Sequence, residues 1–335
     1  MRVAAIDCGT NSIRLLIADA AEVTPEDEAA TPVLTEVLRR TEVVRLGQGV
    51  DRTGRLDPEA LERTLGMCRE YAQQCREHGV PAGKVRFVAT SASRDASNAD
   101  EFVAGVREAF GDLDVAPEVV TGAEEAALSF AGATAGLADA GFDGPYLVAD
   151  IGGGSTEIIR GTHEVIAGTS LDIGCVRLTE RHHRTDPPTQ EVIDAARYDI
   201  AEALDAAEAE VGLGGVRTVV GLAGSVTTVT AQALGLTSYD PSAIHLANVS
   251  VDEMLEACER LILSTRAERA AQPFMHPGRV DVIGAGALIW YEILERARGA
   301  NGPDIVVTAS ERDILDGIAQ SVISLRSVEG EEATG

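Results

Sequence analysis

Two carboxylates, three consecutive glycines and two hydroxyl side chains lie together in residues 150–157, Asp-Ile-Gly-Gly-Gly-Ser-Thr-Glu. Consecutive glycines let the backbone adopt positive φ and bring successive N–H groups close to an anion. Asp150 precedes the glycines and Glu157 follows them, and carboxylates beside a phosphate commonly hold a divalent cation. These residues therefore predict a site for phosphate and a metal ion.

Apolar runs flank this stretch on both sides, which predicts two strands joined by a tight polar turn. The pattern Asp-x-Gly-x-x-Ser also starts at Asp7, 150 − 7 = 143 residues earlier, again between apolar segments. An internal duplication at the scale of a domain is the economical interpretation, and two such hairpins could hold a phosphate chain between them. The alignment pairs Asp7 with Asp150, Gly9 with Gly152, Ser12 with Ser155 and Arg14 with Glu157.

Strands and helices alternate along the chain, which predicts an α/β fold. Asp57-Pro58, a capping residue followed by proline, predicts a helix from there to about His78. Residues 85–89 predict a buried strand, and the hydroxyl-rich segment after it, residues 90–98, is predicted to be a loop. Ligands of open α/β sheets bind at the carboxyl ends of strands, so Arg94 in this loop is a candidate phosphate ligand.

A further strand, residues 216–220, runs into Gly221-Leu222-Ala223-Gly224-Ser225 and then into a predicted helix. A glycine turn that opens a helix is suited to binding an anion. Gly224 and Ser225 are therefore candidate phosphate ligands, with an ordinary tight turn as the alternative.

Length and composition limit the classes of protein. The chain has 335 residues, enough for two domains, and 45% of them are hydrophobic. The net charge of −26 disfavours non-specific binding to DNA, RNA or an anionic membrane. No apolar run approaches the roughly 18–20 residues of a membrane-spanning helix, and the N-terminus does not resemble a signal peptide. We therefore expect a cytoplasmic protein without a membrane partner.

Two residue types exclude further classes. Lys84 is the only lysine and lacks the upstream glycines of a Walker A motif, which excludes a P-loop NTPase. The five cysteines contain no Cys-x-x-Cys and are odd in number, so they are expected to be buried thiols.

Five motifs, in order, resemble those of the exopolyphosphatase / guanosine pentaphosphate phosphatase family, over roughly residues 2–325. They are Asp7-x-Gly-x-Asn11-Ser12, the 90–98 segment with Arg94, Gly122-x-Glu124-Glu125-Ala126, residues 150–157 and Gly221-x-Ala-Gly-Ser225. The resemblance implies two actin-like, Hsp70-like ATPase domains of the ribonuclease H-like type, with a cleft between them. It also implies release of a terminal phosphate from inorganic polyphosphate, or of the 5′ γ-phosphate from guanosine pentaphosphate (pppGpp), with Mg²⁺.

The resemblance also implies roles for individual residues. Its catalytic base falls on Glu125, with Glu124 as the alternative, and this residue would orient the attacking water. Asp7, Asp150 and Glu157 would hold Mg²⁺ or another divalent cation, with K⁺ as a further ion, although Glu157 could instead pair with Arg14. The expected phosphate ligands are Gly9, Asn11, Ser12, Arg94, Gly152, Gly153, Gly154, Ser155, Gly224 and Ser225.

The chain departs from this family at two points. The long members carry a helical C-terminal half that is absent here, which favours short polyphosphate or a guanosine penta- or tetraphosphate. Near the C-terminus the family often has Leu-Arg-x-Gly, whereas this chain has Leu315-Asp316-Gly317 after Ile314, so an arginine role there is not expected.

We expect domain I at residues 1–125, domain II at 126–323 with its last helix packed back on domain I, and a disordered acidic tail at 324–335. A homodimer is compatible with the sequence. An actin-fold kinase and a non-catalytic nucleotide-binding regulator are the alternatives to a phosphohydrolase.

Overall fold

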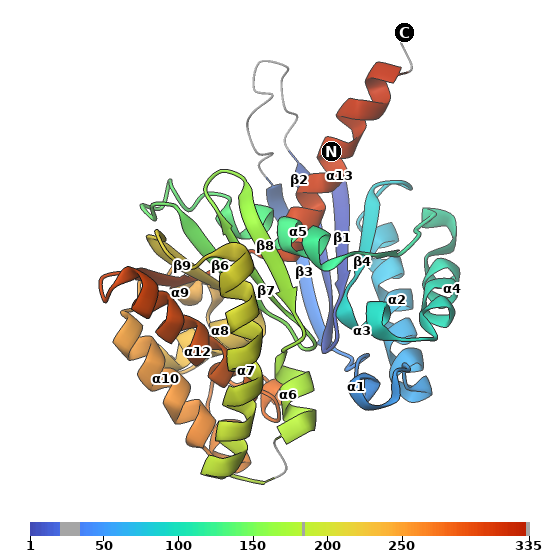
Figure 1. The fold of residues 1–335 in the computed structure, drawn as a ribbon. Helices are drawn as coiled ribbons and strands as arrows, with labels where there is room; N and C mark the ends of the chain where they lie inside the picture. Colours follow the sequence, from blue (N-terminus) through green and yellow to red (C-terminus); the bar gives the residue numbers. More distant parts are fainter. Residues whose placement is uncertain (21–33, 183–184, 333–335) are drawn as a thin grey trace. The chain divides into compact units, whose positions relative to one another are not determined.

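The computed structural model describes residues 1–20, 34–182 and 185–332, with side chains described up to Ile323. By contacts the chain forms two compact units (Figure 1). Unit 1 comprises Met1–Thr121 together with Ile314–Gly335, and unit 2 comprises Gly122–Asp313. The acidic composition of residues 20–32 predicts an exposed loop, and most of this segment lies outside the described residues.

Unit 1 is built on a five-stranded mixed sheet in the order β3-β2-β1-β4-β5. The first three strands pair antiparallel, and β4 and β5 run parallel to β1. The strands are β1 (Arg2–Cys8), β2 (Ser12–Ala20), β3 (Leu34–Val43), β4 (Val85–Ala89) and β5 (Glu118–Val119). β1 is buried along almost its whole length, as expected of a strand with a neighbour on each side.

The long helix of unit 1 starts where the sequence predicts. The Asp57 side chain accepts hydrogen bonds from the N–H groups of Glu59 and Ala60 and caps the long helix α2, whose first residue is proline. Phe87 of β4 packs edge-on against Phe102 and Phe110, which joins the sheet to a second helix. The helices are α1 (Val50–Thr53), α2 (Pro58–Glu77), α3 (Ser91–Asp95), α4 (Ala99–Phe110) and α13 (Ile314–Glu332).

Unit 2 repeats this architecture. Its sheet has the order β10-β9-β6-β7-β8, which read backwards is the order of unit 1, with the same parallel and antiparallel pairs. The strands are β6 (Tyr146–Ile151), β7 (Thr156–Gly161), β8 (Val165–Leu171), β9 (Thr218–Leu222) and β10 (Val306–Ala309). The predicted α/β class with two related halves is confirmed.

The helices of unit 2 enclose a large apolar core. α12 is buried on nearly every side, and its Trp290 lies against Gly221, where any Cβ would come within 2.9 Å of the indole. The helices are α5 (Gly122–Thr134), α6 (Cys175–His182), α7 (Gln190–Val211), α8 (Ala223–Ala233), α9 (Pro241–Ile244), α10 (Val251–Leu263), α11 (Arg266–Ala270) and α12 (Ile283–Asn301). Among the described residues no helix is long and apolar enough to cross a membrane.

The two hairpins match residue by residue. Asp7 lies directly opposite Arg14 in one, and Asp150 lies directly opposite Glu157 in the other. The same backbone bond closes both turns, from Gly9 N to Ser12 O (2.9 Å) and from Gly152 N to Ser155 O (3.0 Å). The predicted alignment of the two halves is therefore confirmed at the level of backbone pairing.

Three local predictions were wrong. The 90–98 segment is not simply a loop, because Ser91–Asp95 forms the short helix α3. The sequence also predicts a helix from about residue 171, but this helix starts at Cys175, since β8 continues through Leu171 along β7. The last helix was expected to end near Ile323, but α13 continues to Glu332, and residues 333–335 lie outside the described part.

α13 belongs to unit 1, where it packs against β1, β2 and β4. Leu315 is buried at its start, and the neighbouring Asp316 accepts a hydrogen bond from Arg39 Nη2 of β3 (2.8 Å). The position where the family often has arginine is thus an apolar packing position. All five cysteines are buried thiols, as predicted.

Candidate active site

Three acidic side chains of unit 2 lie buried and near one another. Asp150 and Glu157 face each other across the β6–β7 hairpin, and Glu125 lies in the first turn of α5. Asp150 Oδ2 accepts a hydrogen bond from Ser129 Oγ, and Glu157 Oε1 accepts one from Ser170 Oγ, each of 2.7 Å. Burial raises the pKa of Glu157 well above its usual value, and the negative charges of Glu125 and Asp150 raise it further.

Such a group of acids favours a cation, because each charge destabilises the others. No set of three or more His, Cys, Asp or Glu side chains among the described residues is arranged to hold a metal ion by itself. The donors nevertheless fit Mg²⁺, which is usually held by one or two carboxylates and completes its shell with water and substrate phosphate. Asp150 and Glu157 are the carboxylates that would hold it.

The buried Glu157 should make stability depend on pH. Its raised native pKa means that the folded chain keeps this proton to higher pH than the unfolded chain, whose pKa is about 4.3. The free energy of unfolding should therefore fall as pH rises through the interval between the two values. We expect Glu157→Gln to remove this fall, measured by urea unfolding between pH 4 and pH 8. The exposed control Glu164→Gln should keep it, and parallel curves for wild type and Glu157→Gln would contradict the prediction.

The N-terminal turn of α6 holds the triple-glycine turn in place. Cys175 N donates to Gly152 O (3.0 Å), and Val176 N donates to Gly153 O (2.9 Å). In a trans peptide the N–H points opposite to the C=O, so the N–H groups of Gly153 and Gly154 point away from α6. These two amides are the donors suited to phosphate. The N–H of Gly152 closes the turn on Ser155 O, so the expected phosphate contact of this amide is replaced by a structural one.

Gly174, just before α6, was not anticipated from the sequence. A Cβ there would lie 2.4 Å from Gly153 O and 2.6 Å from the carbonyl carbon of Gly154. Only glycine lets α6 approach the turn this closely. The segment Ile173-Gly174-Cys175 has no hydrophobic periodicity from which this contact could have been predicted.

Arg279 was also missed. Its guanidinium lies over Gly224, where a Cβ would come within 2.4 Å of Cζ, and its Nη1 donates to Thr228 Oγ1 of α8 (3.2 Å). The guanidinium thus adds positive charge to the N-terminal turn of α8, next to the predicted ligand Ser225. Ser225 is hydrogen-bonded to the Cys175 thiol, which links this turn to the triple-glycine turn through α6.

Unit 1 carries the matching turn with a different charge arrangement. Arg14 donates from Nε (2.8 Å) and Nη2 (2.6 Å) to Asp7 Oδ2. Arg14 thereby supplies at Asp7 the positive charge that a metal ion would supply. Arg14 therefore competes with the expected metal ion for the Asp7 carboxylate.

Polar side chains of α3 lie beside this turn. Thr10 Oγ1 and Ser91 Oγ are 2.9 Å apart, and the buried atoms Asn11 Oδ1 and Ser93 Oγ have no hydrogen-bond partner among the described residues. Such groups fit a polar ligand. Arg94 in the same helix is half-buried and reaches the carbonyl of Val120 (3.4 Å).

Comparison with known proteins identifies the family. Residues 23–314 match the model of the Ppx/GppA phosphatase family. The chain belongs to this family. Exopolyphosphatase 2 of Mycobacterium tuberculosis is 52% identical over 323 residues, which cover 96% of this chain and 98% of that protein. The crystal structure of an exopolyphosphatase-like protein is 42% identical with a TM-score of 0.88, covering 97% of this chain and 100% of that one. The Aquifex aeolicus member is 29% identical with a TM-score of 0.76, covering 97% and 98%.

As a member of the Ppx/GppA family, the chain is related to phosphoric anhydride hydrolases, and the resemblance derived from the motifs is confirmed. In unit 2 the structure brings together Glu125, Asp150, Glu157 and the glycine turn. Glu124 is exposed whereas Glu125 is buried beside the other acids, which favours Glu125 as the base. The individual site roles remain predictions.

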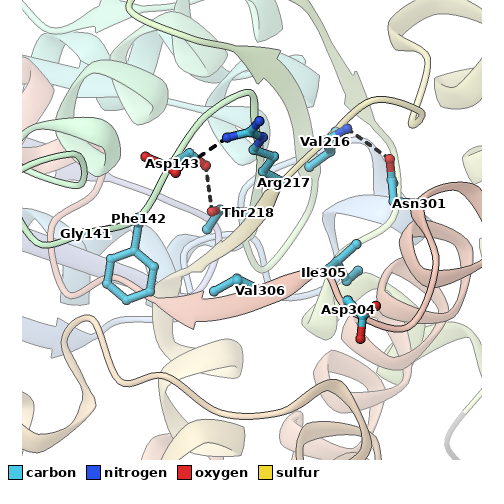
Figure 2. Close-up of a pocket in the computed structure, with 10 residues that line it drawn as sticks. All are labelled: Gly141, Phe142, Asp143, Val216, Arg217, Thr218, Asn301, Asp304, Ile305 and Val306. Carbon is cyan, nitrogen blue, oxygen red and sulfur yellow. Dashed lines mark hydrogen bonds and ion pairs between the residues drawn. The ribbon is translucent and has the colours of Figure 1, made fainter.

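In this Ppx/GppA protein a cavity of about 360 Å³ lies at the amino-terminal ends of strands of the unit 2 sheet (Figure 2). It is lined at the amino ends of β9 and β10 by Thr218 and Val306, whereas the phosphate turns follow the carboxyl ends of β6 and β9. Its polar groups are mostly engaged, because Thr218 Oγ1 donates to Asp143 O (2.8 Å) and Asn301 Oδ1 accepts from Val216 N (2.9 Å). The cavity is therefore separate from the predicted catalytic residues.

Proposed function

We propose that the protein is an exopolyphosphatase that releases terminal orthophosphate from inorganic polyphosphate. Short chains and pppGpp are its proposed substrates. The observation that carries this proposal is the cluster of buried acids, Glu125, Asp150 and Glu157, beside a glycine turn whose amides point away from the supporting helix. The relative that is 52% identical over nearly its whole length, exopolyphosphatase 2, supports the choice of substrate.

In the proposed reaction Glu125 orients a water molecule and accepts its proton as the water oxygen attacks the terminal phosphorus. The P–O bond of the anhydride breaks, and the shortened chain leaves with the bonding electron pair. The N–H groups of Gly153 and Gly154 bind phosphate oxygens. The Ser155 hydroxyl donates to Glu157 in the structure, so it would have to leave Glu157 to donate to phosphate. Mg²⁺ at Asp150 and Glu157 would neutralise charge on the phosphates.

Arg279 answers the difficulty that the net charge poses. A chain of charge −26 repels a polyanion at long range, so binding needs positive charge concentrated at the site. Arg279 supplies such a charge at the N-terminal turn of α8 and presents a planar group that can bind phosphate bidentately. We assign it to the substrate phosphates, together with Ser225 of the same unit. Asn11, Ser12 and Arg94 of unit 1 stay predicted phosphate ligands.

A side-by-side assay tests the function. Phosphate release is measured from tripolyphosphate, long polyphosphate, pppGpp and ATP, with Mg²⁺ and after its removal by chelation. We expect release from polyphosphate that depends on the divalent ion. Tight nucleotide binding without release from any of the four would instead support a regulatory protein, and transfer of phosphate to an acceptor other than water would support a kinase. The cytoplasmic location and the homodimer stay predictions.

A further inference from the structure

We propose that Tyr239 is a positioning residue that fixes the Arg279 guanidinium for substrate phosphate without neutralising it. Glu311 in turn fixes Tyr239. The proposal rests on the phosphate-binding role given to Arg279 above. It adds two residues from distant parts of unit 2, one before α9 and one after β10.

The Arg279 guanidinium lies on the Tyr239 ring, with Cζ 5.8 Å from the ring centroid. Its Nη1 donates to Thr228 Oγ1 (3.2 Å), and that hydroxyl donates to Gly224 O (2.6 Å). The ring and the α8 hydroxyl thus hold a long, flexible side chain over Gly224.

The Tyr239 ring is itself fixed through its hydroxyl. The hydroxyl donates to Glu311 Oε1 (2.6 Å) and lies 2.8 Å from Thr227 Oγ1, which can donate to it. Burial and the neighbouring Glu311 raise the pKa of Tyr239 to about 12, so the hydroxyl keeps its proton throughout the pH range of an assay.

An aromatic partner has an advantage that a carboxylate lacks. A carboxylate would fix the guanidinium but cancel its charge and compete with phosphate for the same N–H groups. Arg14 shows that arrangement at Asp7. No carboxylate among the described residues forms an ion pair with Arg279, so the ring orients this cation while its charge stays available. This matters in a chain that carries 54 acidic residues against 28 basic ones.

A double-mutant cycle on tripolyphosphate hydrolysis tests the proposal. We expect Tyr239→Leu to raise KM by roughly 5- to 20-fold with kcat changed less than about threefold. Tyr239→Phe keeps the ring but removes the hydroxyl that binds Glu311, so its KM should rise by less than the KM of Tyr239→Leu. In an Arg279→Ala background, Tyr239→Leu should add less than about twofold, because the residue through which it acts is gone.

Tyr291 provides a matched control within the same chain. Arg197 lies over its ring at 5.5 Å but also pairs with Glu292. Tyr291→Leu should leave KM for tripolyphosphate unchanged. Thermal unfolding of every variant, with and without tripolyphosphate, separates lost binding from lost folding. If Tyr239→Leu does not fold, Glu311→Ala releases the same ring and should raise KM in the same direction.

The outcomes separate the two assignments. An Arg279→Ala variant with unchanged KM overturns the phosphate role of Arg279 and the role of Tyr239 with it. A raised KM for Arg279→Ala, combined with an effect of Tyr239→Leu that multiplies with it in full, overturns only the positioning role. If the KM of Tyr239→Leu matches that of wild type while Arg279→Ala raises KM, only the positioning role of Tyr239 is overturned.

Discussion

Glu125→Gln is expected to lower kcat for phosphate release from polyphosphate by roughly 10²- to 10⁴-fold, with KM within about threefold of wild type. The amide keeps the size and hydrogen-bonding reach of the side chain but cannot accept the proton of the attacking water. Because Glu125 is buried beside Asp150 and Glu157, removing its charge also relieves repulsion. The variant should therefore melt at the same temperature as the wild type or higher. Steady-state phosphate release and thermal unfolding measure both effects.

Glu124→Gln is the matched control, since Glu124 lies in the same helical turn but is exposed. We expect its kcat to remain within about threefold of wild type. Unchanged turnover by Glu125→Gln would sink the assigned mechanism. A large loss of kcat in Glu124→Gln alone would instead assign the role of catalytic base to Glu124.

Gly174→Ala is expected to lower kcat/KM on polyphosphate by roughly 10- to 100-fold, because small displacements of catalytic groups are costly. The added methyl would lie 2.4 Å from Gly153 O, and the atom it meets is backbone that cannot rotate away. Either α6 or the triple-glycine turn must shift, which moves the Gly153 and Gly154 amides. Overpacking of this kind costs about 1–3 kcal/mol of stability.

Gly299→Ala is the control for Gly174→Ala. Gly299 lies within α12, and a Cβ there meets nothing within 4 Å. It should leave kinetics unchanged and raise stability by about 0.5–1 kcal/mol, since glycine in a helix interior is unfavourable. Wild-type kcat/KM in Gly174→Ala would show that the close approach of α6 does not position the turn.

Local patterns predicted much of the fold. The repeated Asp-x-Gly-x-x-Ser motif predicted two equivalent hairpins, and the register confirms that Asp7 and Asp150 hold equivalent positions. The Asp57-Pro58 cap predicted the start of α2 to the residue. These features depend on neighbours within a few residues, which periodicity and turn chemistry report directly.

The missed residues act over long sequence distances. Arg279 lies just before α12 and meets Gly224 where α12 packs against α8. Gly174 meets Gly153 because the first turn of α6 is hydrogen-bonded to the hairpin. Neither contact leaves a period or a motif in one sequence. The segment 90–98 was misjudged for a different reason, because a helix as short as α3 is too brief for a helical period to be visible.

The position opposite the turn aspartate separates the two halves of this molecule. One half has Arg14 there and the other has Glu157, on the same backbone pairing. If the halves descend from one ancestral repeat, they have diverged in charge at the residue paired with the aspartate of each hairpin. In unit 1 the aspartate forms an ion pair with Arg14, whereas in unit 2 two acids, Asp150 and Glu157, lie opposite each other. The two units thus share the backbone pairing of this hairpin and differ in the charge at the position opposite the aspartate.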